Sequence, residues 1–154
     1  MIDRSFIEQN EAARLELSRL VGRLDERAFG LAVGADWTVS TVLCHLAFWD
    51  RRVFFLLREW QRVPFEATRL SAQSIDSINY AMKVISSAVP GPAAAALAMD
   101  AARDVDSEVA RIGDELIEKI VAAGLVRMLN RSLHRREHLQ RISQAVAGDR
   151  AAGS

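Results

Sequence analysis

Two of the three histidines in this 154-residue chain, His134 and His138, lie four residues apart in a segment with a helical pattern. Side chains at positions i and i+4 of a helix lie above one another on one face, so both imidazoles can bind the same metal ion. A tight site needs a third ligand, and the one other histidine is His45. Three imidazoles with one open coordination position are the ligand set of a catalytic zinc site, and they also suit nickel or iron.

Each of these residues also has an ordinary structural interpretation. A histidine with apolar neighbours on both sides, as His45 has, is commonly a hydrogen-bonded residue of a core or its boundary. A pair spaced like His134 and His138 also occurs by accident on exposed helix faces. Cys44 precedes His45, so on a helix it points about 100° away, which favours a small core residue over a fourth ligand. Spacing alone therefore leaves metal binding open.

Composition narrows the class of protein. Twenty basic residues balance twenty acidic ones, so the net charge indicates neither nucleic acid nor an anionic membrane as a partner. The single cysteine excludes an intrachain disulfide and favours a reducing compartment. The charged N-terminus lacks the apolar core of a signal peptide, and no apolar run approaches the ~20 residues of a membrane span. We expect a cytoplasmic protein with one domain, residues 1–147, and a disordered tail, residues 148–154.

Helical periodicity predicts four long amphipathic helices. The first begins with a capping box at Ser5 and Glu8, and the second begins with Thr38 as its N-cap and ends before Pro64. The predicted long helices span about residues 6–27, 38–62, 92–123 and 125–147, and a shorter helical pattern covers residues 75–88. The predicted buried stripe of the third long helix consists of Leu97, Ala101, Val105, Ile112, Leu116 and Ile120.

These elements predict an all-α fold. The prolines at 90 and 92 interrupt the pattern before the third long helix, as a kink or as a true break. No segment alternates with period two over a useful length, so we expect no strands. Four long helices with a long crossover between the second and the third describe a four-helix bundle. Facing helices of a bundle project side chains into a shared interior, where His45 can meet His134 and His138.

Three short motifs occur in an order that resembles a known group of proteins. Together they resemble the DinB/YfiT-like superfamily of metal-binding four-helix bundles, and the match is closest to the N-terminal type of the mycothiol-dependent maleylpyruvate isomerases. The second motif corresponds to a D-x-x-N element, and the third lies in the last helix. The motifs are Trp37-Thr38-Val39-x-x-Val42-Leu43-x-His45-Leu46-Ala47-Phe48-Trp49-Asp50, Ile75-Asp76-Ser77-Ile78-Asn79 and Asn130-x-x-x-His134-x-x-x-His138-Leu139.

The resemblance implies both a fold and a class of chemistry. It implies an up-down-down-up bundle in which His45, His134 and His138 bind one divalent metal, usually zinc or nickel. Members with known activities transfer or isomerise groups through mycothiol, bacillithiol or glutathione, and some protect against toxic electrophiles. The metal would keep the thiol sulfur deprotonated for attack on an electrophilic carbon. The implied partners are a small electrophile and a thiol, and a homodimer is one expectation because such bundles often dimerise.

Other charged residues near the histidines are candidates for further roles. Arg52 lies two turns from His45, and Arg127 and Arg131 precede His134 by about two turns and one, so each can bind the carboxylate of a thiol or substrate. Asp50 and Glu137 are candidates for an acid or base. All five also fit ordinary exposed charges or surface pairs.

Two further considerations limit the functional interpretation. The sequence continues only a few residues past the predicted fourth helix, so we do not expect the second domain of the full maleylpyruvate isomerase or that particular reaction. The alternative to an enzyme is a non-catalytic helical bundle that binds a ligand or dimerises, with a structural metal or none.

Overall fold

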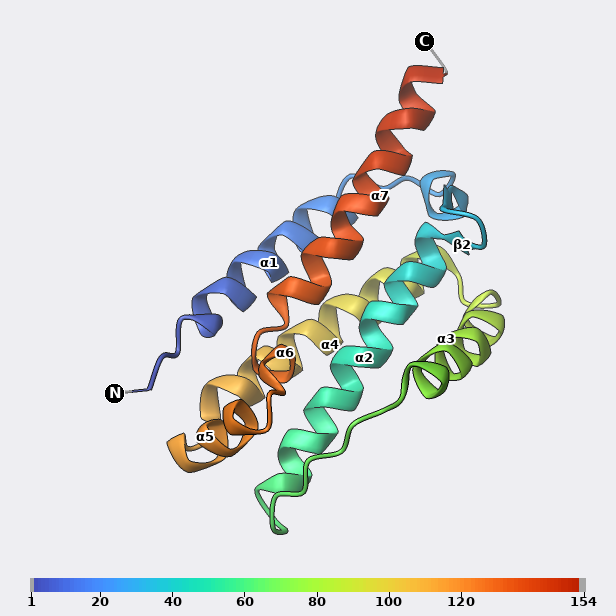
Figure 1. The fold of residues 1–154 in the computed structure, drawn as a ribbon. Helices are drawn as coiled ribbons and strands as arrows, with labels where there is room; N and C mark the ends of the chain where they lie inside the picture. Colours follow the sequence, from blue (N-terminus) through green and yellow to red (C-terminus); the bar gives the residue numbers. More distant parts are fainter. Residues whose placement is uncertain (1, 153–154) are drawn as a thin grey trace.

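The computed structural model describes residues 2–152, which are mostly helical, so the all-α class is confirmed (Figure 1). Four long helices form the body of the molecule, and shorter helices connect them. The long helices are α1 (Phe6–Val21), α2 (Val39–Trp60), α4 (Gly91–Arg111) and α7 (Ser132–Ala152). The shorter elements are the 3-10 turn η1 (Ala28–Gly30), β1 (Ala32–Val33), β2 (Trp37–Thr38), α3 (Ala72–Ser86), α5 (Asp114–Ala122) and α6 (Val126–Leu129).

The long helices lie in two parallel pairs of opposite direction (Figure 1). Ser40 at the start of α2 donates to the carbonyl of Val89 just before α4, and Arg51 pairs with Asp104 further along both helices, so α2 and α4 are parallel. In the same way α1 runs parallel to α7, and this pair runs opposite to α2 and α4. The segment from residue 61 to 71 and α3 together form the crossover between α2 and α4.

The start of α2 is fixed by its cap and by a short hairpin. Thr38 caps the helix as predicted, because its hydroxyl accepts the amide of Thr41 while the Thr41 hydroxyl accepts the amide of Thr38. The prediction of no strands was wrong, since β1 pairs antiparallel with β2 around Gly34, whose φ is +74°. Two-residue strands are too short to show any alternation of apolar and polar residues.

The ends of the first helix differ from the prediction. Ser5 does not cap it: the Ser5 backbone is itself helical, and the Asp3 carboxylate accepts both the amide and the hydroxyl of Ser5. The helix ends at Val21 rather than near Arg27, with Gly22 as its C-cap. Asp25 then accepts the amide of Ala28 and starts the 3-10 turn, which competes with continuation of the helix.

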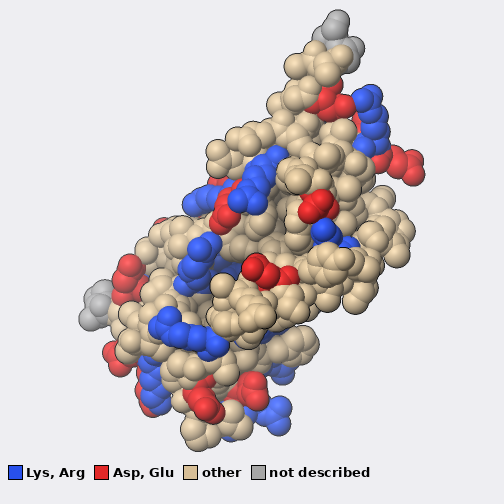
Figure 2. Space-filling view, turned by 45° about the vertical axis from the view of Figure 1, so that its right-hand side comes forward, with Lys and Arg blue, Asp and Glu red and all other residues tan. Residues whose placement is uncertain are grey.

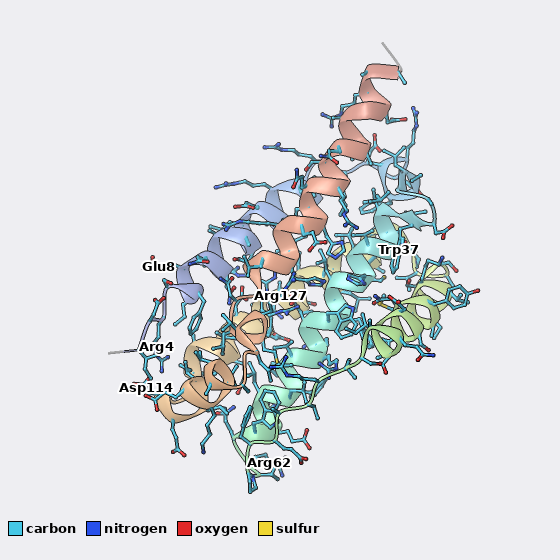
Figure 3. All side chains as sticks on the ribbon, viewed as in Figure 1. Arg4, Glu8, Trp37, Arg62, Asp114 and Arg127 are labelled. Carbon is cyan, nitrogen blue, oxygen red and sulfur yellow. The ribbon has the colours of Figure 1, made fainter. Side chains whose placement is uncertain are left out.

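The third predicted helix is two helices. Ile112 and Gly113 take extended backbone angles, and the Gly113 carbonyl accepts the amides of Leu116 and Ile117 to start α5. Most of the predicted stripe is buried, but Leu97 is 49% exposed, so its assignment was wrong. The interruption before α4 is a true break, from residue 87 to 90. Arg4 of the N-terminal segment pairs with Asp114 at the start of α5 (Figure 3).

The last predicted helix is also divided, at Asn130 and Arg131. Asn10 of α1 lies against this break: its amide nitrogen donates to the carbonyl of Leu129, and its side-chain oxygen accepts the amide of Ser132. Backbone groups that the break leaves without helical partners are thereby satisfied in the interior. The helix continues to Ala152, so residues 148–152 are helical rather than disordered as predicted, and residues 153 and 154 lie outside the described part.

Charged residues and loosely packed segments occupy the surface. Acidic and basic side chains are interspersed on the face shown in Figure 2. The helix α3 lies at the edge of the body and buries only Ser86, while Tyr80, Val84 and Ile85 are exposed. No helix within residues 2–152 combines the length and apolar character needed to cross a membrane.

The apolar core is divided into two clusters by a buried polar layer. On α2 the first cluster ends at Cys44 and the second begins at Val53, and on α7 the first cluster begins at Leu139. Between them, Asp50 is 1% exposed and accepts a hydrogen bond from Arg131 at 2.8 Å and another from Arg135 at 3.0 Å. A buried charge is tolerated only when paired and hydrogen-bonded, and here each is.

Arg135 is the centre of this layer and has no exposed surface. Its guanidinium also donates to both oxygens of Asp106 on α4 and to the carbonyls of Asn10 on α1 and Ala102 on α4. Burial disfavours the charged form, but the two carboxylates outweigh it and raise the pKa of Arg135 above its ordinary value. One side chain of α7 is thereby bonded to all three other long helices.

Replacing Arg135 should test this dependence. Arg135→Met leaves Asp50 and Asp106 as buried carboxylates with too few partners, so we expect a loss of about 3 kcal/mol or more in unfolding free energy. The adjacent change Arg136→Met removes an exposed pair with Glu16 at 3.1 Å and should cost about 1 kcal/mol or less. Urea denaturation monitored by circular dichroism measures both, and equal losses would contradict the role of the polar layer.

Candidate metal centre

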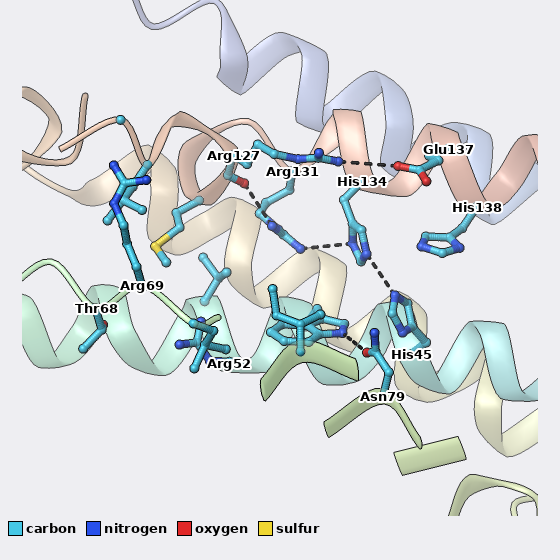
Figure 4. Close-up of a pocket in the computed structure, with 17 residues that line it drawn as sticks. His45, Arg52, Thr68, Arg69, Asn79, Arg127, Arg131, His134, Glu137 and His138 are labelled. Carbon is cyan, nitrogen blue, oxygen red and sulfur yellow. Dashed lines mark hydrogen bonds and ion pairs between the residues drawn. The ribbon is translucent and has the colours of Figure 1, made fainter. Parts of the chain in front are cut away.

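The three histidines converge on one point between α2 and α7 (Figure 4). Nε2 of His45 lies 3.1 Å from Nε2 of His134, and one ring nitrogen from each histidine lies within 4.8 Å of the other two. His45 is 7% exposed, and the other two are partly buried. The predicted convergence of a distant histidine with the i, i+4 pair is therefore confirmed.

The helices and their neighbours hold these rings in place. His134 and His138 lie one turn apart on α7, which faces the antiparallel α2. Trp37 packs edge-on against His45 at a ring separation of 5.4 Å, and Trp49, one turn further along α2, lies 6.3 Å from it. Trp49 also lines the cavity beside the histidines.

Hydrogen bonds fix how His134 holds its proton in the absence of metal. Arg131 lies with a guanidinium nitrogen 3.2 Å from Nδ1 of His134. A guanidinium can only donate, so Nδ1 accepts, and a neutral His134 carries its proton on Nε2 and donates it to Nε2 of His45. Metal-binding histidines usually donate from the second nitrogen to an acceptor. Binding of an ion at Nε2 of His134 therefore requires the Arg131 contact to rearrange.

All three histidines are neutral at neutral pH. Burial, and then the charges of His138 and Arg131, lower the pKa of His45 to about 3. Burial is also the main cause that lowers the pKa of His138 to about 4 and the pKa of His134 well below its usual value. Neutral imidazoles have a lone pair for a metal, so the cluster stays competent to bind an ion well into the acidic range.

The donor set fits a divalent ion that prefers nitrogen. Two nitrogens on one tetrahedral zinc ion lie about 3.4 Å apart, close to the 3.1 Å between His45 and His134. Among residues 2–152, no cysteine or carboxylate joins the three histidines as a fourth ligand. Nδ1 of His45 and Nδ1 of His138 are buried and have no hydrogen-bond partner in that part of the chain. The geometry matches a three-ligand site with an open position rather than a closed structural site.

The other candidate residues, Asp50, Glu137 and Cys44, differ in whether they line the cavity. Asp50 is enclosed by two guanidiniums and does not line the cavity, so it is no candidate for an acid or base. Glu137 lines the cavity but pairs with Arg127 at 3.5 Å and with Arg141 at 3.3 Å. Cys44 is a buried residue of the apolar core, as expected.

A cavity of about 610 Å³ opens beside the histidines. The size is that of a pocket for a small organic molecule. All three arginines singled out from the sequence, Arg52, Arg127 and Arg131, line it, as do all three histidines. Its apolar wall consists of Trp49, Val53, Leu70, Ile75, Leu125 and Met128.

Arg69 was not found from the sequence; it reaches the cavity from the crossover and donates to the carbonyl of Ala123. Asn79, the last residue of the D-x-x-N element, accepts the indole N–H of Trp49 at 3.0 Å and so connects α3 to the cavity wall. Arg135 could have been noticed because it lies within the histidine motif, but an arginine in a helix is usually solvent-exposed.

Comparison of this chain with protein-family models, with curated proteins and with solved structures finds no match.

Acid should destabilise the metal-free protein through these histidines. Their pKa values are about 6.5 in the unfolded chain and lower in the folded one, so below pH 6.5 the unfolded state binds more protons. The free energy of unfolding is therefore not reduced by these histidines above pH 6.5, and it decreases as the pH falls towards about 4. Each histidine contributes a slope of up to about 1.4 kcal/mol per pH unit.

Urea denaturation in the presence of a chelator, between pH 7 and 5, measures this slope. The variant His138→Gln should show a shallower slope than the wild type, since it lacks one of the titrating groups. Equal slopes for the two proteins would contradict the assigned pKa of His138.

Proposed function

We propose that this protein is a DinB-like four-helix bundle that binds one divalent metal ion through His45, His134 and His138 and promotes reactions of a small thiol with an electrophile. The observation that carries the proposal is the convergence of three neutral imidazoles on the wall of a cavity. Three further features support the proposal: the directions of the long helices, the type of donor atom and the residues that line the cavity.

The helix directions support the proposed fold type. In order along the chain, α1, α2, α4 and α7 run up, down, down and up, and the long crossover connects α2 to α4 (Figure 1). This is the arrangement implied by the ordered motifs of the sequence. The second motif contributes Asn79, which bonds Trp49 beside the histidines. Two motifs distant in the sequence thus lie at one site.

The donor type supports zinc or nickel. Three imidazoles suit these borderline ions, whereas magnesium and calcium prefer carboxylate and carbonyl oxygens. A divalent ion bound to three ligands acts as a Lewis acid that lowers the pKa of a thiol or water in its open position. In the proposed transfer, the thiol sulfur forms a bond to the electrophilic carbon, the thiol proton passes to solvent, and the leaving group departs with its bonding electrons.

The residues of this chain contribute positioning rather than proton transfer. The apolar wall excludes water from one side of the histidines, and Trp49 offers a flat surface for an organic reactant. Glu137 is held by two arginines at the side of the cavity.

Metal content tests the first part of the proposal. Protein purified without a histidine tag should contain about one zinc or nickel ion per chain by elemental analysis. Zinc at 100 times its dissociation constant should stabilise the fold by about 2.7 kcal/mol, seen as a higher melting temperature. His134→Ala should lose both effects, while Cys44→Ala should keep them. A wild type that contains no metal and does not respond to added metal would refute the site.

Thiol transfer tests the second part. Mycothiol, bacillithiol and glutathione, each offered with monochlorobimane, should react faster in the presence of the metal-loaded protein than without it. His45→Ala should remove the acceleration, and Cys44→Ala should retain it because the protein thiol is buried in the core. Acceleration that survives His45→Ala would show that the reaction does not depend on the metal centre.

A non-catalytic module is the second candidate. The exposed side chains of Tyr80, Val84 and Ile85 on α3 favour it, since apolar groups gathered on a surface commonly mark an interaction site. In that case the protein would form a homodimer or bind a ligand without turnover. Sedimentation measurements together with the thiol-transfer assay separate the two candidates.

A further inference from the structure

The charges that line the cavity are not balanced within it. Of its four arginines, Arg131 pairs with Asp50 at 2.8 Å and Arg127 pairs with Glu137 at 3.5 Å. Arg69 donates to a carbonyl oxygen, which carries no full charge. Arg52 pairs with no carboxylate in the described part of the chain. The guanidiniums of Arg52 and Arg69, which lie on the same side of the pocket (Figure 4), therefore lack an acidic partner in the described part of the chain.

Arg52 is the better placed of the two for a ligand. It is partly buried, and its guanidinium lies 5.7 Å from the centre of the Trp49 ring. Burial, and then the positive charge of Arg131, lower its pKa from the ordinary value. Both causes mean that the cation is held in an unfavourable environment that an anion would relieve. A planar guanidinium binds carboxylates with two parallel hydrogen bonds.

The spacing along α2 sets the length of a ligand that reaches both ends. His45, Trp49 and Arg52 lie at positions i, i+4 and i+7, so they face the same side of the helix. Seven residues correspond to about 10 Å along the axis, with the Trp49 ring between the ends. The wall around Trp49 includes Val53 and Met128 and is apolar.

We propose that Arg52 binds the carboxylate of the natural ligand of this pocket, an elongated organic anion whose apolar body lies along Trp49 towards the histidines. The orientation of its far end towards the histidines rests on the proposed function, whereas the binding of the carboxylate at Arg52 does not. The proposal selects one of the three arginines that the sequence left equivalent and assigns a chemical class to the reactant.

Calorimetric titration with 4-phenylbutyrate tests the proposal, with the neutral 4-phenylbutyramide as the matched ligand. The acid should bind the wild type more tightly than the amide does. Arg52→Met keeps most of the side-chain length and should weaken binding of the acid by roughly tenfold or more, since a charge-assisted hydrogen bond contributes about 1.5–3 kcal/mol. Arg52→Lys keeps the charge and should retain part of the affinity.

Arg58→Met is the control variant. Arg58 lies on the same helix, with its guanidinium 5.5 Å from the ring centre of Phe54, and it does not line the cavity. Its replacement should leave the affinity for the acid unchanged. The indole N–H signal of Trp49 in an NMR spectrum should shift when the acid binds the wild type and the Arg58→Met variant.

The titrations are run on zinc-loaded and on chelator-treated protein, so that the two proposals can fail separately. Loss of acid binding in Arg52→Met, with unchanged zinc content, supports the assignment. Acid binding by chelator-treated wild type that contains no metal when purified would keep this inference and refute the metal centre. Equal affinities of wild type and Arg52→Met, equal affinities of acid and amide, or no binding of the acid would overturn the inference.

Discussion

The structure depends on one buried carboxylate, that of Asp50, which binds both Arg131, just before α7, and Arg135 of α7. The start of α7 and the residue before it are thereby fixed against α2 in a layer where apolar packing is interrupted. A buried ion pair with a missing partner is strongly unfavourable, so a shift of α7 along α2 would leave buried charges unpaired. The polar layer therefore specifies the register of α7 against α2. That register decides where His134 and His138 face.

The same layer connects the fold to the site through Arg131. This side chain donates to Asp50 and also lies against Nδ1 of His134. Arg131, which mainly pairs with Asp50 in the polar layer, thus also determines the tautomer of His134 in the metal-free protein. The second nitrogen of a metal-binding histidine normally faces an acceptor, so the Arg131 contact would have to rearrange for an ion to bind. The cavity beside the histidines provides the space for that movement and for a reactant.

Much of the fold followed from periodicity and caps, and the errors have specific causes. The N-cap at Thr38 and the approximate bounds of α2 were predicted, because a threonine before an apolar run satisfies free amides locally. The breaks at Gly113 and Asn130 were missed. Gly113 has an extended backbone in a segment whose apolar pattern predicts one continuous helix. The break at Asn130 is stabilised by Asn10, which lies 120 residues earlier in the chain. The capping box at Ser5 failed because Asp3 offers a nearer acceptor.

The sequence by itself determined the helical class and the i, i+4 pair on α7, because these follow from local spacing, and it supplied the three histidines that can bind a metal. The tertiary structure alone decided that His45 meets the pair, that Asp50 is enclosed by arginines, and that Arg52 rather than Arg131 is free for a ligand. All three depend on how α2 and α7 pack, and packing places together residues more than 80 positions apart. Arginines that are equivalent in the sequence therefore differ in role because the folded structure gives them different partners.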